Sequence, residues 1–319
     1  MGKKRGLFLS LTAAAMTGVG FLAGNRLYGR FIKPQARPED EPDHSTAVTE
    51  GRRFVREHAG HQDVYLDSID LVKLHAVYIE AQAASSRAGS GDGQNHRYAI
   101  LVHGINDHCE SMGIYARHYL MEGIHVLLPD LRGFGKSEGD YVGYGYDDRL
   151  DIIEWIYWIL HRDPAAQIIL HGTSMGAATV LMTAGEHLPA NVVAVISDSA
   201  YTSAREAFSH VQAQDQKTIL PFSVAFTLLR WETRARAGYD LEDVSPVEAV
   251  GRARVPILFL HGDADRLVPV SMAMRLYEEA AGKKRLVTFL GADHLRAVVT
   301  EPEKYWDEID RLLKDVRFF

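Results

Sequence analysis

A chain of 319 residues with 46% hydrophobic and 24% charged residues is long enough for one large domain or two small ones with a full apolar core. Its net charge of −7 and the lack of a basic block argue against a nucleic-acid partner. The single cysteine, Cys109, excludes an internal disulfide and hence a disulfide scaffold, although it leaves the compartment open.

Residues 1–32 have the features of a targeting segment. Three basic residues at positions 3–5 precede twenty residues without charge, which as a helix span about 30 Å, roughly one hydrocarbon core. We predict an uncleaved single-pass signal-anchor in the cell membrane, with the catalytic domain on the extracytoplasmic side. Two alternatives stay open: a signal peptide cleaved near the alanines at 13–15, which gives a secreted protein, and an amphipathic or disordered leader.

The next segment, residues 33–50, is rich in proline, charge and small polar residues, which is typical of a linker. A globular domain is therefore predicted over residues 51–319. Its first two apolar segments, at 63–69 and 73–81, carry β-branched and aromatic residues in partial alternation. This pattern predicts an antiparallel pair of strands.

From about Tyr98 onward, short apolar runs alternate with segments of helical periodicity. This order predicts an α/β fold with a mostly parallel sheet and helices on both faces. The alternation breaks between about 201 and 246, where the apolar helical sequence ILPFSVAFTLLRWETRA occurs and no strand is evident. We predict a helical cap inserted at the sheet edge, whose apolar residues either pack on the sheet or line a substrate site.

The pentapeptide Gly172-Thr173-Ser174-Met175-Gly176 fits the pattern G-x-S-x-G at the point where a predicted strand turns into a helix. Such a turn strains the backbone of its central residue and leaves room only for glycine two positions away on either side. The Ser174 hydroxyl would then project at the carboxyl end of the sheet, beside helix N–H groups that favour negative charge. Ser174 is the predicted nucleophile; the alternative is a glycine turn with an idle serine.

A serine hydroxyl needs a base within hydrogen-bond reach, and the base needs a carboxylate to orient it. His294 follows the last predicted strand at the carboxyl edge of the sheet and is the predicted base. Asp265, in the loop after the preceding strand, is the predicted acid, and Asp263 is assigned to bracing that turn. Asp198, which ends an earlier strand, is the rival acid.

Two backbone N–H groups are predicted to form an oxyanion hole, because the negative oxygen of a tetrahedral intermediate needs donors aimed at it. One belongs to Met175, directly after the predicted nucleophile. The other belongs to Ile105, since Gly104 lets the loop after the first parallel strand fold inward. A plain glycine turn is the alternative there. His261, which ends a strand, is interpreted as a packing or turn residue.

Five motifs occur in order: HG at 103–104, PDLRGFGKSEG at 129–139, G-x-S-x-G, HGDADRLVP at 261–269 and GADH at 291–294. Together they resemble the α/β-hydrolase superfamily, in particular its serine-aminopeptidase-like and esterase-like branches with their membrane-tethered bacterial members. The resemblance covers about Tyr98 to the C-terminus and implies an α/β-hydrolase fold. The loop His-Gly-Ile-Asn departs from the His-Gly-Gly-Gly of one lipase and esterase group, which disfavours that group.

The predicted activity is therefore hydrolysis of a small-molecule carboxylic ester through an acyl-enzyme, without a cofactor. The first alternative is a peptidase or amidase acting on short peptides with the same triad. It would need a carboxylate for the free amine, and nothing in the sequence singles out Glu206, Asp215 or Glu232 for that task. A non-catalytic binding protein on this fold is the second alternative.

Three other signals are set aside. Cys109 is expected on a loop, without the setting that favours Ser174. The run GKS at 135–137 lacks the glycine at position 130 that a phosphate-binding loop requires. No metal site is predicted, because the histidines at 103, 108 and 118 lack recognisable ligand spacing.

Overall fold

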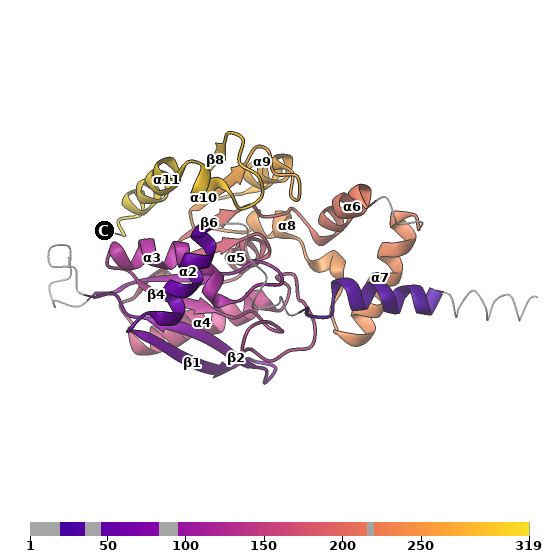
Figure 1. The fold of residues 1–319 in the computed structure, drawn as a ribbon, viewed down its shortest axis with the longest axis horizontal. Helices are drawn as coiled ribbons and strands as arrows, with labels where there is room; N and C mark the ends of the chain where they lie inside the picture. The colour runs from indigo at the N-terminus through magenta and orange to yellow at the C-terminus, as the bar shows by residue number, and fades with distance from the viewer. Residues whose placement is uncertain (1–19, 36–45, 83–94, 216–219, 319) are drawn as a thin grey trace, which may run out of the picture.

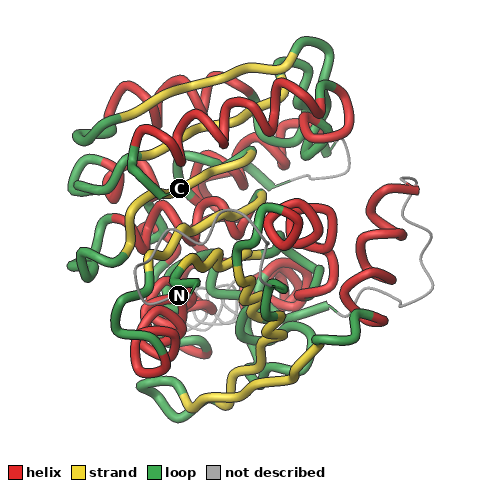
Figure 2. Tube along the Cα trace, turned by 90° about the vertical axis from the view of Figure 1, so that its left-hand side faces the viewer, coloured by secondary structure: helices red, strands yellow, loops and turns green. Residues whose placement is uncertain are grey.

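An eight-stranded sheet runs through the part of the chain that the computed structural model describes, residues 20–35, 46–82, 95–215 and 220–318 (Figure 1). The strand order is β1-β2-β4-β3-β5-β6-β7-β8, and the strands twist progressively along the sheet (Figure 2). Their bounds are β1 His61–Asp67, β2 Lys73–Ile79, β3 Arg97–Val102, β4 His125–Pro129, β5 Gln167–Thr173, β6 Val192–Asp198, β7 Ile257–Gly262 and β8 Lys284–Phe289.

Strand β2 runs antiparallel to both of its neighbours, β1 and β4, whereas all other pairs in the sheet are parallel. The antiparallel pair predicted at the start of the domain and the mostly parallel sheet predicted after it are both confirmed. All the parallel strands point their carboxyl ends to one edge, so the loops that follow β3, β5, β7 and β8 meet there.

Both faces of the sheet are covered, because side chains alternate along each strand. In β3, Ile100 and Val102 belong to one apolar core, while Ala99 and Leu101 belong to the other. The first core is closed by α4 Asp148–Arg162, α5 Met175–Ala184, α8 Pro246–Val250 and α9 Val270–Glu279. The second is closed by α2 Thr46–Glu57, α3 Gly113–Met121, α10 Ala297–Thr300 and α11 Pro302–Asp315, with the 3-10 turn η1 Cys109–Met112 ahead of α3.

The interval between β6 and β7 is helical, with α6 Ala204–Gln214, α7 Phe222–Arg236 and the short turn η2 Leu241–Asp243 before α8. Figure 1 shows α6 and α7 standing beside the sheet, with the helix over residues 20–31 next to them. The rings of Phe31 and Phe208 pack edge to face with centroids 5.2 Å apart. The guanidinium of Arg236 lies 3.8 Å from the centre of the Tyr28 ring. The N-terminal helix is therefore packed on the cap.

The prediction of a single-pass N-terminal anchor is wrong. Among the described residues, no helix is both long enough and apolar enough to cross a membrane. The described part of the predicted anchor, residues 20–32, instead packs against protein: Tyr28 and Ile32 are buried in the same core as the cap. The described part of the uncharged stretch that suggested a membrane span has a protein partner in α7. Residues 1–19 lie outside the described part of the chain.

Part of the predicted linker at 33–50 is also placed. Helix α2 begins at Thr46, inside that segment, and residues 36–45 lie outside the described part of the chain. Val55 of α2 is fully buried, and Gly51 lies against Gly113 so closely that no side chain fits between the two backbones. Helix α2 is thereby held against α3. The division into linker, domain and cap otherwise stays a prediction.

Candidate active site

Ser174 lies between the end of β5 and the start of α5, with a backbone φ of 52° and ψ of −115°. Non-glycine residues rarely adopt this region, and strain of this kind is typical of functional turns. A Cβ on Gly172 would lie 2.1 Å from the carbonyl oxygen of Gly176. One on Gly176 would lie 2.2 Å from the carbonyl oxygen of Val102. Both glycines are therefore required by the crossing of β5, α5 and β3.

The structure brings together Ser174, His294 and Asp265, three residues far apart in sequence. His294 Nε2 lies 2.9 Å from Ser174 Oγ, and His294 Nδ1 lies 2.7 Å from Asp265 Oδ2. An ionised carboxylate can only accept hydrogen bonds, so Nδ1 carries the proton and Nε2 accepts the hydrogen bond that the serine hydroxyl donates. His294 comes from the loop after β8, and Asp265 from the loop after β7.

Besides His294, two backbone N–H groups and a second histidine contact the carboxylate of Asp265. Its Oδ1 accepts hydrogen bonds from the backbone N–H groups of Leu267 and Val268, at 2.9 and 2.8 Å. His261 Nε2 lies 3.3 Å from Oδ2 and 2.7 Å from the carbonyl oxygen of Val268. Burial alone would raise the pKa of Asp265, but hydrogen bonds from His261, His294 and Val268 lower it well below its usual value. The carboxylate is therefore ionised and fixed in place.

The contact of His261 with the acid was not predicted from the sequence, where this residue was interpreted as a packing or turn residue. It is fully buried, and its Nε2 contacts the carboxylate of Asp265. The spacing of four residues in HGDAD was the available signal. Asp263, assigned to the turn, accepts the N–H of Gly291 at 2.6 Å and so ties the two loops together.

Asp198, the rival acid, points into a different network. Its Oδ2 accepts a hydrogen bond from the Tyr305 hydroxyl at 2.9 Å, and its Oδ1 accepts one from the Ser199 hydroxyl, also at 2.9 Å. Burial raises its pKa, opposed by these two hydrogen bonds. Its backbone carbonyl accepts the N–H of Ser174 at 2.8 Å, so Asp198 supports the nucleophile's turn through the main chain.

The two predicted oxyanion donors border the same space. Gly104 lies so close to Ser174 that an added Cβ would be 3.4 Å from the serine Cβ, which brings the loop after β3 against the nucleophile. Ile105 follows in that loop and lines the cavity beside Ser174. Within the described part of the chain, the N–H groups of Ile105 and Met175 have no hydrogen-bond partner. Both are therefore available to a bound oxygen.

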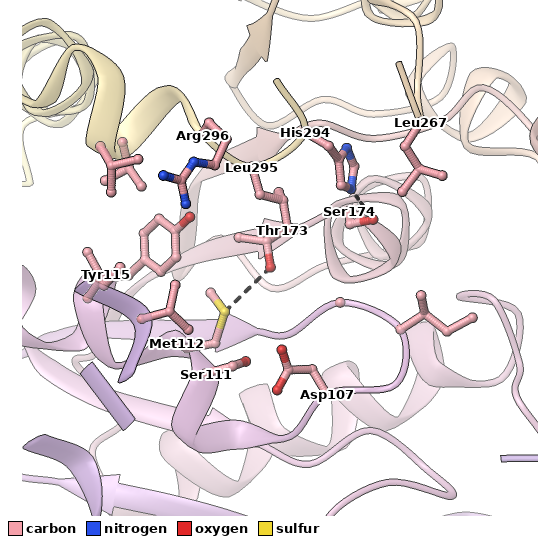
Figure 3. Close-up of a pocket in the computed structure, with 16 residues that line it drawn as sticks. Asp107, Ser111, Met112, Tyr115, Thr173, Ser174, Leu267, His294, Leu295 and Arg296 are labelled. Atoms are coloured by element: carbon pink, nitrogen blue, oxygen red, sulfur yellow. Dashed lines mark hydrogen bonds between the residues drawn. The ribbon is translucent and has the colours of Figure 1, made fainter. Parts of the chain in front are cut away.

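A cavity of about 370 Å³ opens beside Ser174 and His294 (Figure 3). This volume suits a small organic ligand. Its walls come from the start of α2, the loop after β3 with α3, and the segment after His294. Most lining side chains are apolar, among them Val48, Ile105, Met112, Ile114, Leu267, Leu295, Val298 and Val299.

The predicted cap contributes none of its described residues to this cavity. Phe226 and Leu229 of α7 are buried in the core, so packing accounts for the apolar face of that helix. The element that reaches over the site is α2, through Val48. This position of α2 was not predicted, because the helix begins inside a segment whose composition is typical of a linker.

One cluster in the described part of the chain has ligand atoms close enough for a metal: His75, Cys109 and Asp130, all buried and within 4.8 Å of one another. Their hydrogen bonds are already made. Asp130 accepts the N–H of Cys109 at 2.7 Å and of Lys136 at 2.9 Å, and its other contact is to His75 Nδ1 at 2.7 Å. Burial raises the pKa of the Cys109 thiol well above its usual value. The cluster fits a structural network that anchors β2 and the loop after β4.

Comparison with known proteins gives a family match within the α/β domain. The family model described as "Serine aminopeptidase, S33" matches residues 93–228, which include Ser174 and end before Asp265 and His294. The uncharacterized protein Rv2307c of Mycobacterium tuberculosis is 28% identical over 312 residues, 96% of this chain and 94% of that protein.

Two solved structures of hydrolases share the architecture. The esterase Pf2001 of Pyrococcus furiosus has a TM-score of 0.64 at 20% identity, over 90% of this chain and 98% of that chain. An acylaminoacyl peptidase of Pyrococcus horikoshii has a TM-score of 0.56 at 16% identity, over 80% of this chain and 41% of that chain. At such identities the likeness establishes the fold and leaves the substrate open.

Proposed function

We propose that the chain is a hydrolase of the α/β-hydrolase superfamily that cleaves carboxylic esters with Ser174 as nucleophile. The proposal rests on two consecutive hydrogen bonds. Ser174 Oγ lies 2.9 Å from His294 Nε2, and His294 Nδ1 lies 2.7 Å from Asp265 Oδ2. Nothing in the described residues supports the membrane-tethered type included in the resemblance.

In the proposed reaction, Ser174 Oγ attacks the ester carbonyl while His294 Nε2 takes the hydroxyl proton. The carbonyl oxygen becomes negative and accepts hydrogen bonds from the N–H groups of Ile105 and Met175. His294 then returns the proton to the departing alcohol, leaving an acyl-enzyme. Water attacks the acyl-enzyme by the same steps and releases the acid, while Asp265 holds the imidazole in one orientation throughout.

An ester fits the cavity better than the free N-terminus of a peptide. An aminopeptidase needs a carboxylate near the nucleophile, and the three candidates weighed above lie elsewhere: Glu206 contacts Arg275, Asp215 contacts Arg30, and Glu232 contacts Arg236. Asp107 is the one carboxylate among the cavity's lining residues, and it is paired with Arg52. A peptidase or amidase acting on short peptides with the same triad stays the alternative, in keeping with the family description.

The test compares wild type with Ser174→Ala on p-nitrophenyl acyl esters and on aminoacyl naphthylamides. We expect turnover of the esters to exceed that of the amides, and Ser174→Ala to lower it by at least about 10³-fold. A fluorophosphonate probe should label the wild type and not the variant. Circular dichroism provides the control that the variant is folded.

Each contrary result has a distinct meaning. Preference for the naphthylamides would favour the peptidase alternative on the same residues. An unlabelled, inactive wild type would favour the non-catalytic binding protein. Turnover retained by Ser174→Ala would refute the assignment of the nucleophile.

A further inference from the structure

The cavity beside Ser174 contains a positive charge that the described part of the chain does not neutralise. Apart from His294, its charged lining side chains are Asp107 and Arg296. Asp107 accepts hydrogen bonds from Arg52 Nη2 at 3.1 and 3.3 Å, so this carboxylate is compensated. The guanidinium of Arg296 has no ion pair or hydrogen bond with any described residue, and its charge is available to a ligand.

The position of Arg296 sets how a ligand would lie. In Figure 3 its guanidinium points toward Tyr115, and the side chain of Leu295 lies between it and the pair Ser174–His294. The surfaces between these two ends are mostly apolar. A molecule that reaches from the nucleophile to the guanidinium therefore crosses an apolar stretch before it meets the charge.

Resting on the proposed function, we propose that this site selects esters carrying an anionic group, such as a carboxylate, separated from the scissile carbonyl by an apolar chain. Arg296 is the specificity-determining residue. A guanidinium donates two parallel N–H bonds to a carboxylate, and such charge-assisted bonds are among the strongest in proteins. A neutral ester of the same length would leave this group facing water.

Two matched pairs of probes test the inference, one for each side of the ester bond. The first compares p-nitrophenyl hexanoate with the mono-p-nitrophenyl ester of adipic acid, whose acyl chain ends in a carboxylate. The second compares phenyl butyrate with 4-carboxyphenyl butyrate, whose leaving group carries the charge. The measured quantity is kcat/KM for the anionic ester divided by kcat/KM for its neutral partner, in wild type and in Arg296→Gln.

We expect Arg296→Gln to lower this ratio about tenfold in at least one pair, the effect of losing one charge-assisted hydrogen bond. Comparing the ratio between proteins cancels the intrinsic reactivity of the probes. The matched control is Arg117→Gln on α3. Arg117 is exposed and does not line the cavity, so its substitution removes the same charge away from the site. It should leave the ratio within about twofold.

The inference is overturned if Arg296→Gln leaves the ratio unchanged in both pairs, or if Arg117→Gln lowers it equally, which would indicate a diffuse charge effect. Lack of turnover of the neutral esters by the wild type, together with failure of fluorophosphonate labelling, would instead overturn the proposed function. The two failures are therefore distinguishable.

Discussion

At the scale of single residues, two buried aspartates near the nucleophile have opposite environments. Asp265 accepts from two backbone N–H groups and two histidines, which keeps it ionised. Asp198 is surrounded by hydroxyl donors, and burial raises its pKa. A carboxylate that orients a histidine must carry charge to stabilise the imidazolium that forms. Charge and contact together favour Asp265.

We therefore expect Asp265→Asn to lower kcat on a p-nitrophenyl ester by about 10³- to 10⁴-fold, because the amide offers a donor where His294 Nδ1–H needs an acceptor. Asp198→Asn should keep kcat within several-fold and lower the free energy of unfolding by about 1 kcal/mol, since one hydroxyl loses its acceptor. Initial rates and urea unfolding measure the two effects. A large rate loss in Asp198→Asn alone would show that the acid is misassigned.

The lowered pKa of Asp265 also fixes the sign of its effect on stability. A carboxyl group whose pKa is lower in the folded state stabilises the fold above its unfolded pKa, and this stabilisation is lost as pH falls through the folded value. Asp265 thus stays ionised in mild acid. Protonation of this carboxylate therefore does not account for any loss of activity in mild acid.

At the scale of elements, the first turn of α4 contributes two buried aspartates, Asp148 and Asp151, to a cluster around the buried Arg132. Arg132 donates to both carboxylate oxygens of Asp151, at 2.8 and 2.7 Å, and to Asp70 at 2.9 Å. Asp148, fully buried, receives only the N–H of Gly145 at its Oδ2, and its Oδ1 has no hydrogen-bond partner among the described residues. Burial, reinforced by Asp151, raises the pKa of Asp148 to about 7.

A raised carboxyl pKa destabilises the fold as pH rises, because between pH 4 and 7 the folded state binds more protons than the unfolded state. We expect ionisation of Asp148 to cost up to about 3 kcal/mol between pH 5 and pH 8, at about 1.4 kcal/mol per pH unit up to its pKa of about 7. Asp148→Asn should remove this slope. The measurement is urea unfolding at both pH values, and the comparison is the difference between pH 5 and pH 8 in each protein. Equal differences in both proteins would contradict the assignment.

At this scale, a feature could be predicted from the sequence when it depends on residues close together in the chain or on the order of the strands. The turn at Ser174 was predictable because any side chain two residues away on either side would collide with backbone atoms, so glycine is required there. The loops of Asp265 and His294 were predictable because parallel strands deliver their carboxyl ends to one edge. Their catalytic roles stay predictions. The place of α2 over the cavity was not predictable, because its contacts, such as Gly51 with Gly113, join segments distant in sequence.

At the scale of the whole molecule, the N-terminal helix packs on the cap and on the loop between β4 and α4. The Tyr144 hydroxyl donates to the carbonyl oxygen of Phe31 at 2.7 Å, a bond between residues 113 positions apart. The N–H of Val142 donates to the carbonyl oxygen of Ile32, also at 2.7 Å. An uncharged apolar run in a sequence does not reveal whether lipid or protein will cover it. Here, within the described residues, the covering surface is the cap together with the loop between β4 and α4.

This packing predicts a sharp difference between two apolar residues of the same segment. Ile32 is fully buried, whereas Leu22, ten residues earlier, is 68% exposed. Ile32→Ala should lower the free energy of unfolding by about 2–5 kcal/mol, because it leaves a cavity in the core. Leu22→Ala should change it by less than about 0.5 kcal/mol, because its side chain already meets solvent. Urea unfolding of the full-length chain, followed by circular dichroism, measures both. Small and equal effects would mean that the segment does not pack on the cap, while a large effect confined to Ile32 would make residues 20–32 part of the folded domain.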